Sequence, residues 1–402
     1  MSGQRRIVHS CILSSLLLML AIVVAVSACG QPKEARWQGV APTTKAMSAA
    51  DSATVDQAAK AALDSSGGQL PAMWIGIWDP AKGYYVAAYG EAVKGGAAAT
   101  VADHSRIGSV TKTFTAVAVL RQVEAGKLAL TDTVQKVLPD LATKYPGLAA
   151  ITIEQLLAMR SGIPDFANTG IVLKPVVADP TKVWSVDDII AAVMDAGGLK
   201  APGTPGYSTT NTLILGKMLE KVTGKSIEVA VNAVAKQAGL TQSALQAPAE
   251  TKMPGPASHG FLNDPGVAGL KDAGVTGQPG QDVSAWTVSW GQAGGGMYST
   301  INDLKLWAAT GLGNTLLPKS LGERRLVAQS IGEGNYGLGV FNWGNGWMGH
   351  TGQLIGWESV VAYNKDTGAV FVAIVNETGS LMTALTVAQG SFPDLLQGML
   401  GL

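Results

Sequence analysis

Strand-like sequence is gathered at the two ends of this chain of 402 residues, and the long stretch between them has the spacing of helices. Runs rich in β-branched and aromatic residues occupy residues 73–78, 84–89, 336–341, 346–349, 357–363 and 369–375. Between about Leu130 and Trp290 apolar residues recur at helical spacing, as in residues 153–159, 186–194 and 213–222. Because strands must pair to bury their faces, the two ends are predicted to form one sheet with a helical domain inserted between them.

Further helices are predicted beside the strands. One pattern covers residues 53–63 and another covers 301–310. A third begins at Val110, where apolar side chains recur every three or four residues until Gly126 can end the helix. Ser109 is therefore placed at the N-terminus of a helix. These elements predict an α/β part at residues 51–130 and 292–402, with a helical part at 131–291.

The first 28 residues have the layout of an export signal. Arg5 and Arg6 precede an apolar run at residues 12–26, which is shorter than the roughly twenty residues of a membrane-spanning helix. The run ends in Val-Ser-Ala-Cys29, which resembles a bacterial lipobox; an uncleaved signal anchor is the alternative. We expect a signal peptide at 1–28, lipidation of Cys29, and attachment to the outer face of the plasma membrane. Residues 29–50 are expected to be a flexible tether, followed by the enzyme-sized body at 51–402.

The composition excludes several classes of function. Apolar residues make up 47% of the chain and the net charge is +0, which is typical of a globular body. Charged residues are only 14%, and no basic patch alternates with aromatic residues, so nucleic acid is not expected as a partner. No cluster of Cys, His and carboxylate residues has metal-ligand spacing, so neither a metal nor a cofactor is expected. Oligomeric state is left open.

A serine and a lysine three residues apart begin the helix at Val110. Ser109 and Lys112 would share one helical face, so that the amine could activate the hydroxyl for attack on a carbonyl. The spacing alone is weak, because about one such pair is expected by chance. Its position at a helix start adds weight, since the backbone N–H of Ser109 would face a developing oxyanion.

Two further segments complete a recognisable set. Tyr207-Ser208-Thr209 lies on a loop just before a helix, and His350-Thr351-Gly352 is predicted at the entry to a strand. With Ser109-Val110-Thr111-Lys112 they resemble the ordered motifs Ser-x-x-Lys, Tyr-x-Asn and Lys/His-Thr-Gly of class C β-lactamases and D-alanyl-D-alanine carboxypeptidases, the penicillin-recognising serine hydrolases. The segments ITIEQLLAMRSGIPD and GQAGGGMYSTINDL also resemble that family. The resemblance implies a serine β-lactamase-like fold, with an antiparallel sheet flanked by helices.

The resemblance also implies a role for each matching residue. Ser109 would form an acyl-enzyme, Lys112 and Tyr207 would share the proton, and His350 would complete the catalytic set. A nearby lysine ammonium favours the tyrosinate form of Tyr207, whereas burial disfavours either charge, so the two residues titrate as a coupled pair and the general base is left open. The backbone N–H groups of Ser109 and Gln353 would form the oxyanion hole.

Substrate contacts are expected from a further set of four residues: Thr209, Asn211, Thr351 and Gly352. Gly352 would let the substrate backbone lie close to its strand. Thr209 stands where the family has Asn and cannot offer an amide's two donors and acceptor, so Asn211 is considered as its substitute. His350 replaces the commoner Lys, so a substrate carboxylate would be bound less well as the pH rises past the histidine pKa.

Two classes of function remain. The first is a serine hydrolase acting on a peptidoglycan-type peptide, a β-lactam or a carboxylic ester, as a carboxypeptidase or an esterase. The second is an inactive envelope lipoprotein that binds peptidoglycan or a partner protein through the same cleft.

Overall fold

The computed structural model describes residues 34–168, 170–263 and 277–400, and the chain from Arg36 onward forms one compact unit. The predicted signal peptide at 1–28 and its lipidation site Cys29 lie outside the described residues. Within the described ranges, no helix is both long enough and apolar enough to span a membrane.

Both ends of the chain meet in one antiparallel sheet of eight strands, in the order β2-β1-β12-β11-β10-β9-β8-β7. The strands are β1 Ala72–Asp79, β2 Gly83–Gly90, β7 Gln329–Ser330, β8 Asn335–Tyr336, β9 Phe341–Gly344, β10 Trp347–Leu354, β11 Trp357–Asn364 and β12 Val370–Val375. Met73 of β1 pairs with Val375 of β12, which joins the N-terminal hairpin to the C-terminal strands. The prediction of a single sheet built from both ends is confirmed.

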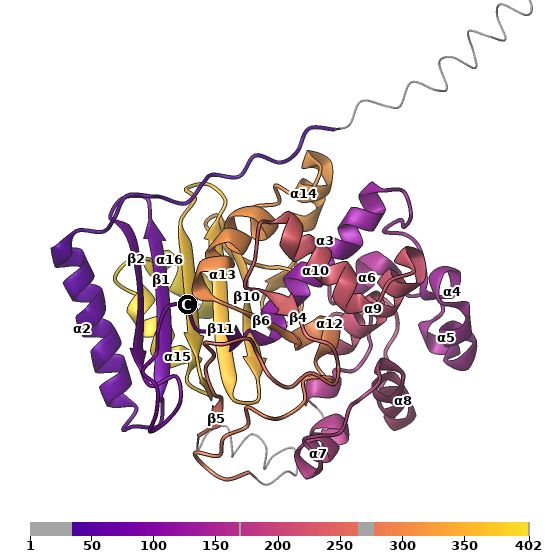
Figure 1. The fold of residues 1–402 in the computed structure, drawn as a ribbon. Helices are drawn as coiled ribbons and strands as arrows, with labels where there is room; N and C mark the ends of the chain where they lie inside the picture. The colour runs from indigo at the N-terminus through magenta and orange to yellow at the C-terminus, as the bar shows by residue number, and fades with distance from the viewer. Residues whose placement is uncertain (1–33, 169, 264–276, 401–402) are drawn as a thin grey trace, which may run out of the picture. The chain divides into compact units, whose positions relative to one another are not determined.

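Helices cover both faces of the central strands (Figure 1). On one face α2 (Ala49–Ser65) and α15 (Leu381–Ala388) pack on side chains such as Ile75 of β1 and Phe371 of β12. On the other face α3 (Thr111–Glu124) and α13 (Ile301–Trp307) share a core with Trp74 and Val372. Since neither face meets water, β12 is apolar throughout rather than alternating.

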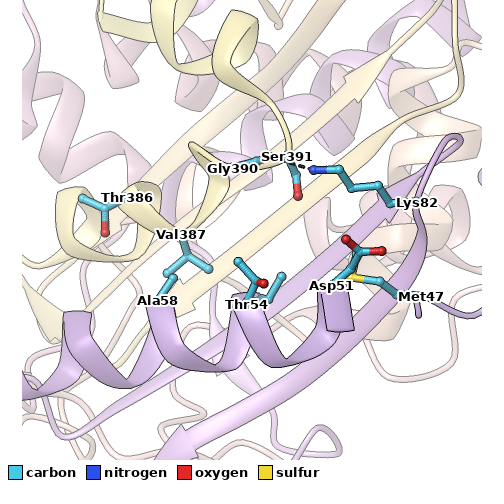
Figure 2. A pocket seen from close by; sticks show the side chains of 10 residues that line it. Met47, Asp51, Thr54, Ala58, Lys82, Thr386, Val387, Gly390 and Ser391 are labelled. Atoms are coloured by element: carbon cyan, nitrogen blue, oxygen red, sulfur yellow. Dashed lines mark hydrogen bonds between the residues drawn. The ribbon is translucent and has the colours of Figure 1, made fainter. Parts of the chain in front are cut away.

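A small pocket remains between α2 and α15, on the face of the sheet opposite α3 (Figure 2). Val55, Ala58 and Val387 form its apolar wall. At one end the Nζ atom of Lys82, from the β1–β2 turn, donates to the carbonyl of Gly390 at 2.8 Å. The pocket is a packing gap, and neither α3 nor Ser109 lines it.

The inserted segment is mainly helical, as predicted. It contains α4 Val134–Val137, α5 Pro139–Lys144, α6 Ile153–Leu157, α7 Gly170–Ala178, α8 Val186–Ala196, α9 Thr209–Thr223 and α10 Ile227–Gln237. Thr152 and Gln155 form a capping box at the start of α6, and Gly224 ends α9 in the left-handed conformation. The short strands β4 (Ala244–Leu245) and β5 (Phe261–Leu262) follow.

One predicted strand is interrupted. Residues 336–341 were expected to be continuous, but residues 337–340 leave the sheet between β8 and β9. Gly339 has a φ of 73°, and a Cβ there would lie 2.2 Å from the Cβ of Ala116 on α3. The loop therefore passes directly against the helix that carries the candidate nucleophile, and glycine permits this approach.

The body also begins earlier than predicted. The N–H of Trp37 donates to Leu317, and Met47 and Lys45 exchange backbone hydrogen bonds with Tyr84 of β2. Residues 36–50, expected as part of a flexible tether, are therefore attached to the sheet and to the loop before α14 (Lys319–Leu326). These contacts are irregular and leave no periodic pattern in the sequence.

Candidate active site

The segment that carries Ser109 is pressed against strand β10. A short 3₁₀ turn, Gly108–Val110, leads into α3. Gly108 has a φ of 50°, and a Cβ there would lie 2.6 Å from the backbone nitrogen of Gln353. A Cβ on Gly352 would lie 2.0 Å from the carbonyl oxygen of Ile107. Gly352 therefore admits the backbone that precedes Ser109, and its predicted contact with substrate stays a prediction.

Lys112 is buried directly beneath Ser109. Its side chain is 1% exposed, and its Nζ atom lies 2.8 Å from Ser109 Oγ and 2.9 Å from the carbonyl oxygen of Gly294. Burial lowers the pKa of Lys112 to about 7, although the carboxylate of Asp165 acts in the opposite direction. A substantial fraction of the amine is therefore neutral near pH 7 and able to accept the serine proton.

Tyr207 lies beside this pair, one residue before the N-cap of α9. Lys112 Nζ is 5.0 Å from the centre of its ring, which stacks on Phe341. Burial and nearby negative charge raise the pKa of Tyr207 well above its usual value, while a hydrogen bond with Ser109 acts to lower it. The sequence left open which of the two is the base; the raised pKa of Tyr207 and the lowered pKa of Lys112 favour the lysine.

His350 is buried and uncharged. It is the fourth residue of β10 and lies within the strand rather than at its entry. Its Nδ1 atom is 2.5 Å from the carbonyl oxygen of Thr351, which can only accept, so Nδ1 carries the proton. Its Nε2 atom therefore accepts from the hydroxyl of Tyr336 at 2.9 Å. Burial and the charge of Lys112 lower the pKa of His350 to about 3, so it offers no cation to a substrate at neutral pH.

Thr209 and Asn211 lie on opposite sides of the first turn of α9. The N–H of Thr209 donates to Asp165 Oδ1 at 2.9 Å. Two positions along a helix differ by about 200°, so a residue two places after Thr209 faces away from it. Asn211 is fully buried, with its amide held by Ser161 Oγ at 2.6 Å and by the sulfur of Met159. The prediction that Asn211 contacts substrate in place of the family Asn is contradicted by this burial.

Asp165 is a charged group that sequence reasoning left without a role. Its carboxylate accepts the backbone N–H groups of Ala167 and Thr209 and interacts with the charge of Lys112. Burial raises its pKa, and these partners oppose the rise. Its position in a loop between Pro164 and Phe166 has no helical or strand period, so no pattern signals it. Asp165 fixes the start of α9 and supplies negative charge under the lysine.

The segments that carry the two predicted oxyanion-hole groups, the N–H of Ser109 and the N–H of Gln353, lie against each other. Within the described part of the chain, the N–H of Ser109 donates no hydrogen bond, and the backbone of Gln353 lies against Gly108. The side-chain amide of Gln353 donates to Glu358 on β11 at 2.9 Å. Thr351 is half-buried, and its hydroxyl has no hydrogen-bond partner among the described residues.

The site therefore combines a nucleophile, a buried amine whose pKa is near neutrality, a protonated tyrosine, and donors beside the serine. Such an arrangement suits acyl transfer through a covalent intermediate. Among the described residues, no group of three His, Cys, Asp or Glu side chains is placed to hold a metal ion.

Comparison with known proteins identifies a family and similar proteins. The Beta-lactamase family model matches residues 53–389. Penicillin-binding protein 4 of Amycolatopsis lactamdurans is 28% identical over 331 residues, which are 76% of this chain and 78% of that protein.

Solved structures share the fold. The D-stereospecific amidohydrolase from a Streptomyces species superposes with a TM-score of 0.72 at 27% identity, covering 85% of this chain and 98% of its own. The D-amino acid amidase from Ochrobactrum anthropi SV3, complexed with L-phenylalanine amide, has a TM-score of 0.68 at 22% identity, covering 86% and 99%. The predicted serine β-lactamase-like fold is confirmed. Because the family match covers more than half of its length, the chain belongs to the beta-lactamase family of penicillin-recognising serine hydrolases.

Proposed function

We propose that this protein hydrolyses small carboxylic amides or esters through an acyl-enzyme on Ser109. The observation that carries the proposal is the 2.8 Å contact between Ser109 Oγ and the fully buried Nζ of Lys112. A lysine pKa of about 7 supports it, because an amine with that pKa accepts a proton at neutral pH.

Acylation begins with attack of Ser109 Oγ on the substrate carbonyl carbon. The hydroxyl proton passes to the neutral Nζ of Lys112, and the carbonyl oxygen becomes an oxyanion facing the N–H groups of Ser109 and Gln353. A donor of this kind is worth about 3 kcal/mol in hydrolases. When the tetrahedral intermediate collapses, the bond to the leaving amine or alcohol breaks and that group takes the proton of Tyr207. The ammonium of Lys112 returns a proton to Tyr207, so the lysine is neutral again before deacylation.

Deacylation repeats the sequence with water. Lys112 takes a proton from the water as its oxygen attacks the acyl carbon. Collapse of the second intermediate breaks the bond to Ser109 Oγ, which recovers its proton from the lysine. Tyr207 lies beside Ser109 and keeps its proton, so it is the donor for the departing group.

Several features favour a small amide or ester over a β-lactam or a peptidoglycan peptide. Thr209 has no amide to bind an acylamide group, and its N–H is already held by Asp165. His350 is uncharged and gives no anchor for the carboxylate that penicillins carry. The solved relatives described as an amidohydrolase and an amino acid amidase support the same choice.

Intact-protein mass spectrometry tests this function. We expect a p-nitrophenyl acyl ester to leave an acyl group on the native protein but none on Ser109→Ala, and benzylpenicillin to react much more slowly. The matched control is Ser105→Ala, which removes a buried serine bonded to Ser258 and should keep the adduct. An absence of adduct, together with hydrolysis no faster than the uncatalysed reaction in both the native protein and Ser109→Ala, would favour the non-catalytic binding protein instead.

We also propose that the protein is exported and anchored through a lipid on Cys29. The support is the charged and apolar layout of residues 1–28. Fractionation of cells that express the native protein and Cys29→Ala checks it. Release of the variant from the membrane fraction is expected, and equal membrane retention would contradict lipidation.

A further inference from the structure

Glu333 lies at the tip of a tight hairpin between β7 and β8. The N–H of Ile331 donates to the carbonyl of Gly334 at 2.9 Å and closes the turn. Gly332 and Gly334 have φ values of 94° and 140°, which glycine adopts readily. The turn projects the side chain of Glu333, which is exposed.

The base of this hairpin is part of the active site. Ile331 is buried in an aromatic cluster against which Tyr207 packs. The ring of Tyr336, on β8, lies 6.2 Å from the ring of Tyr207, and its hydroxyl donates to His350. The hairpin that carries Glu333 at its tip therefore extends from the wall of the site that contacts Tyr207.

The carboxylate of Glu333 has no partner within the described part of the chain. Arg160, on the adjoining segment, donates instead to the backbone carbonyl of Ser330 at 3.3 Å. Partial burial and the charge of Asp165 raise the pKa of Glu333, and both carboxylates in turn raise the pKa of Tyr207. The charges of Asp165 and Glu333 thus both act on Tyr207, and of these two carboxylates that of Glu333 is exposed and able to bind a ligand.

The buried basic groups of the site offer a substrate no free positive charge. The Nζ of Lys112 is hydrogen-bonded to Ser109 and Gly294, and His350 is neutral. Beside Glu333 a substrate carboxylate would meet like charge, whereas an ammonium would form a charge-assisted hydrogen bond. Among substrates with the same scissile bond, the negative charge of Glu333 therefore favours those that carry an ammonium group.

We propose that Glu333 binds the protonated amine of the substrate, so that the site selects aminoacyl amides and esters with a free amino group over acylated or carboxylate-bearing analogues. This assignment rests on the proposed acyl-enzyme chemistry at Ser109. To that proposed function it adds the class of substrate and the residue that recognises this class.

The test compares three substrates that release the same chromophore: phenylalanine p-nitroanilide, its N-acetyl form and its N-succinyl form, each as the D and the L isomer. The native protein is expected to prefer the free amine by kcat/KM. Glu333→Gln keeps the shape and removes the charge, and should lower the ratio of free to acetylated substrate roughly 10-fold, mainly through KM, as expected for one charged contact.

Charge reversal and a control separate recognition from stability. Glu333→Lys should move the preference toward the N-succinyl substrate, an outcome that general damage to the hairpin cannot produce. Glu323→Gln removes an exposed carboxylate on α14 and should leave all ratios unchanged.

Hydrolysis with the same substrate ratios in native protein, Glu333→Gln and Glu333→Lys would overturn the assignment and leave the proposed hydrolase intact. Failure of the native protein to hydrolyse any of these substrates, or to form an adduct at Ser109, would overturn both.

Discussion

Replacing Lys112 by methionine should show two effects of this lysine separately: its requirement for hydrolysis, and the loss of folding stability that its burial causes. Methionine has a similar length and no charge, so it can fill the same space. We expect Lys112→Met to lose hydrolysis while gaining stability relative to the native protein at and below neutral pH. The gain should depend on pH, because the lysine titrates differently in the folded and unfolded chains.

The size of the effect follows from the pKa. Folding lowers the pKa of Lys112 from 10.5 to about 7, a difference of about 3.5 units, which corresponds to about 5 kcal/mol at 1.36 kcal/mol per unit. Between these two values the unfolded chain binds more protons than the folded one, so the unfolding free energy of the native protein rises with pH. Below pH 7 the buried ammonium imposes its full cost. The lost hydrogen bonds to Ser109 and Gly294 offset the gain by about 1–3 kcal/mol each.

Urea unfolding of both proteins at pH 7.5 and 9.5 isolates the charge contribution. The native protein should gain about 2–3 kcal/mol more than Lys112→Met over this interval, since other groups cancel in the comparison. Lys236→Met, which removes an exposed lysine from α10, is the control and should follow the native protein. If the native protein and Lys112→Met change in parallel, the lysine is not titrating near neutrality and the reasoning is refuted.

Three other variants probe the site and its surroundings. Tyr207→Phe should lower kcat on an amide about 10²–10⁴-fold through loss of the proton donor, and unchanged steady-state rates would exclude that role. Gly352→Ala places a Cβ 2.0 Å from the carbonyl oxygen of Ile107, so we expect lower activity and a loss of at least about 2 kcal/mol in urea unfolding; native-like behaviour would contradict the close packing. Burial raises the pKa of Glu377 from 4.5 to about 7, so native stability should fall by about 3 kcal/mol as the pH rises through that window, and Glu377→Gln should remove this fall; equal slopes would contradict it.

Much of the fold and the core of the site could be predicted from sequence. Helical spacing after Val110 placed Ser109 at a helix start, and the apolar run that forms β12 was recognisable as a strand. The motif order brought Tyr207 and His350 to Ser109. These predictions succeeded because each depends on local spacing or on motifs with a fixed order.

The predictions that failed depend on contacts between distant segments. Asn211 was predicted to contact substrate because it lies two positions after Thr209 in the sequence, but α9 places the two side chains on opposite sides of the helix. The charge of His350 depends on its burial and on the charge of Lys112, and neither can be read from its neighbours in the sequence. Asp165 acts across 44 positions on the N–H of Thr209, and a single carboxylate in a loop gives no signal of such a contact.

The pairing of β1 with β12 delays completion of the sheet until most of the chain has been synthesised. Met73 pairs with Val375, so 375 − 73 = 302 residues separate the two partners. A ribosome adds about 5–20 residues per second, so roughly 15–60 s pass between the synthesis of β1 and the synthesis of β12. During that time the inner edge of β1 is unpaired and its apolar faces are uncovered. The nascent chain is thus open to aggregation until its C-terminus is made, and a chaperone that binds extended apolar segments would act in this interval.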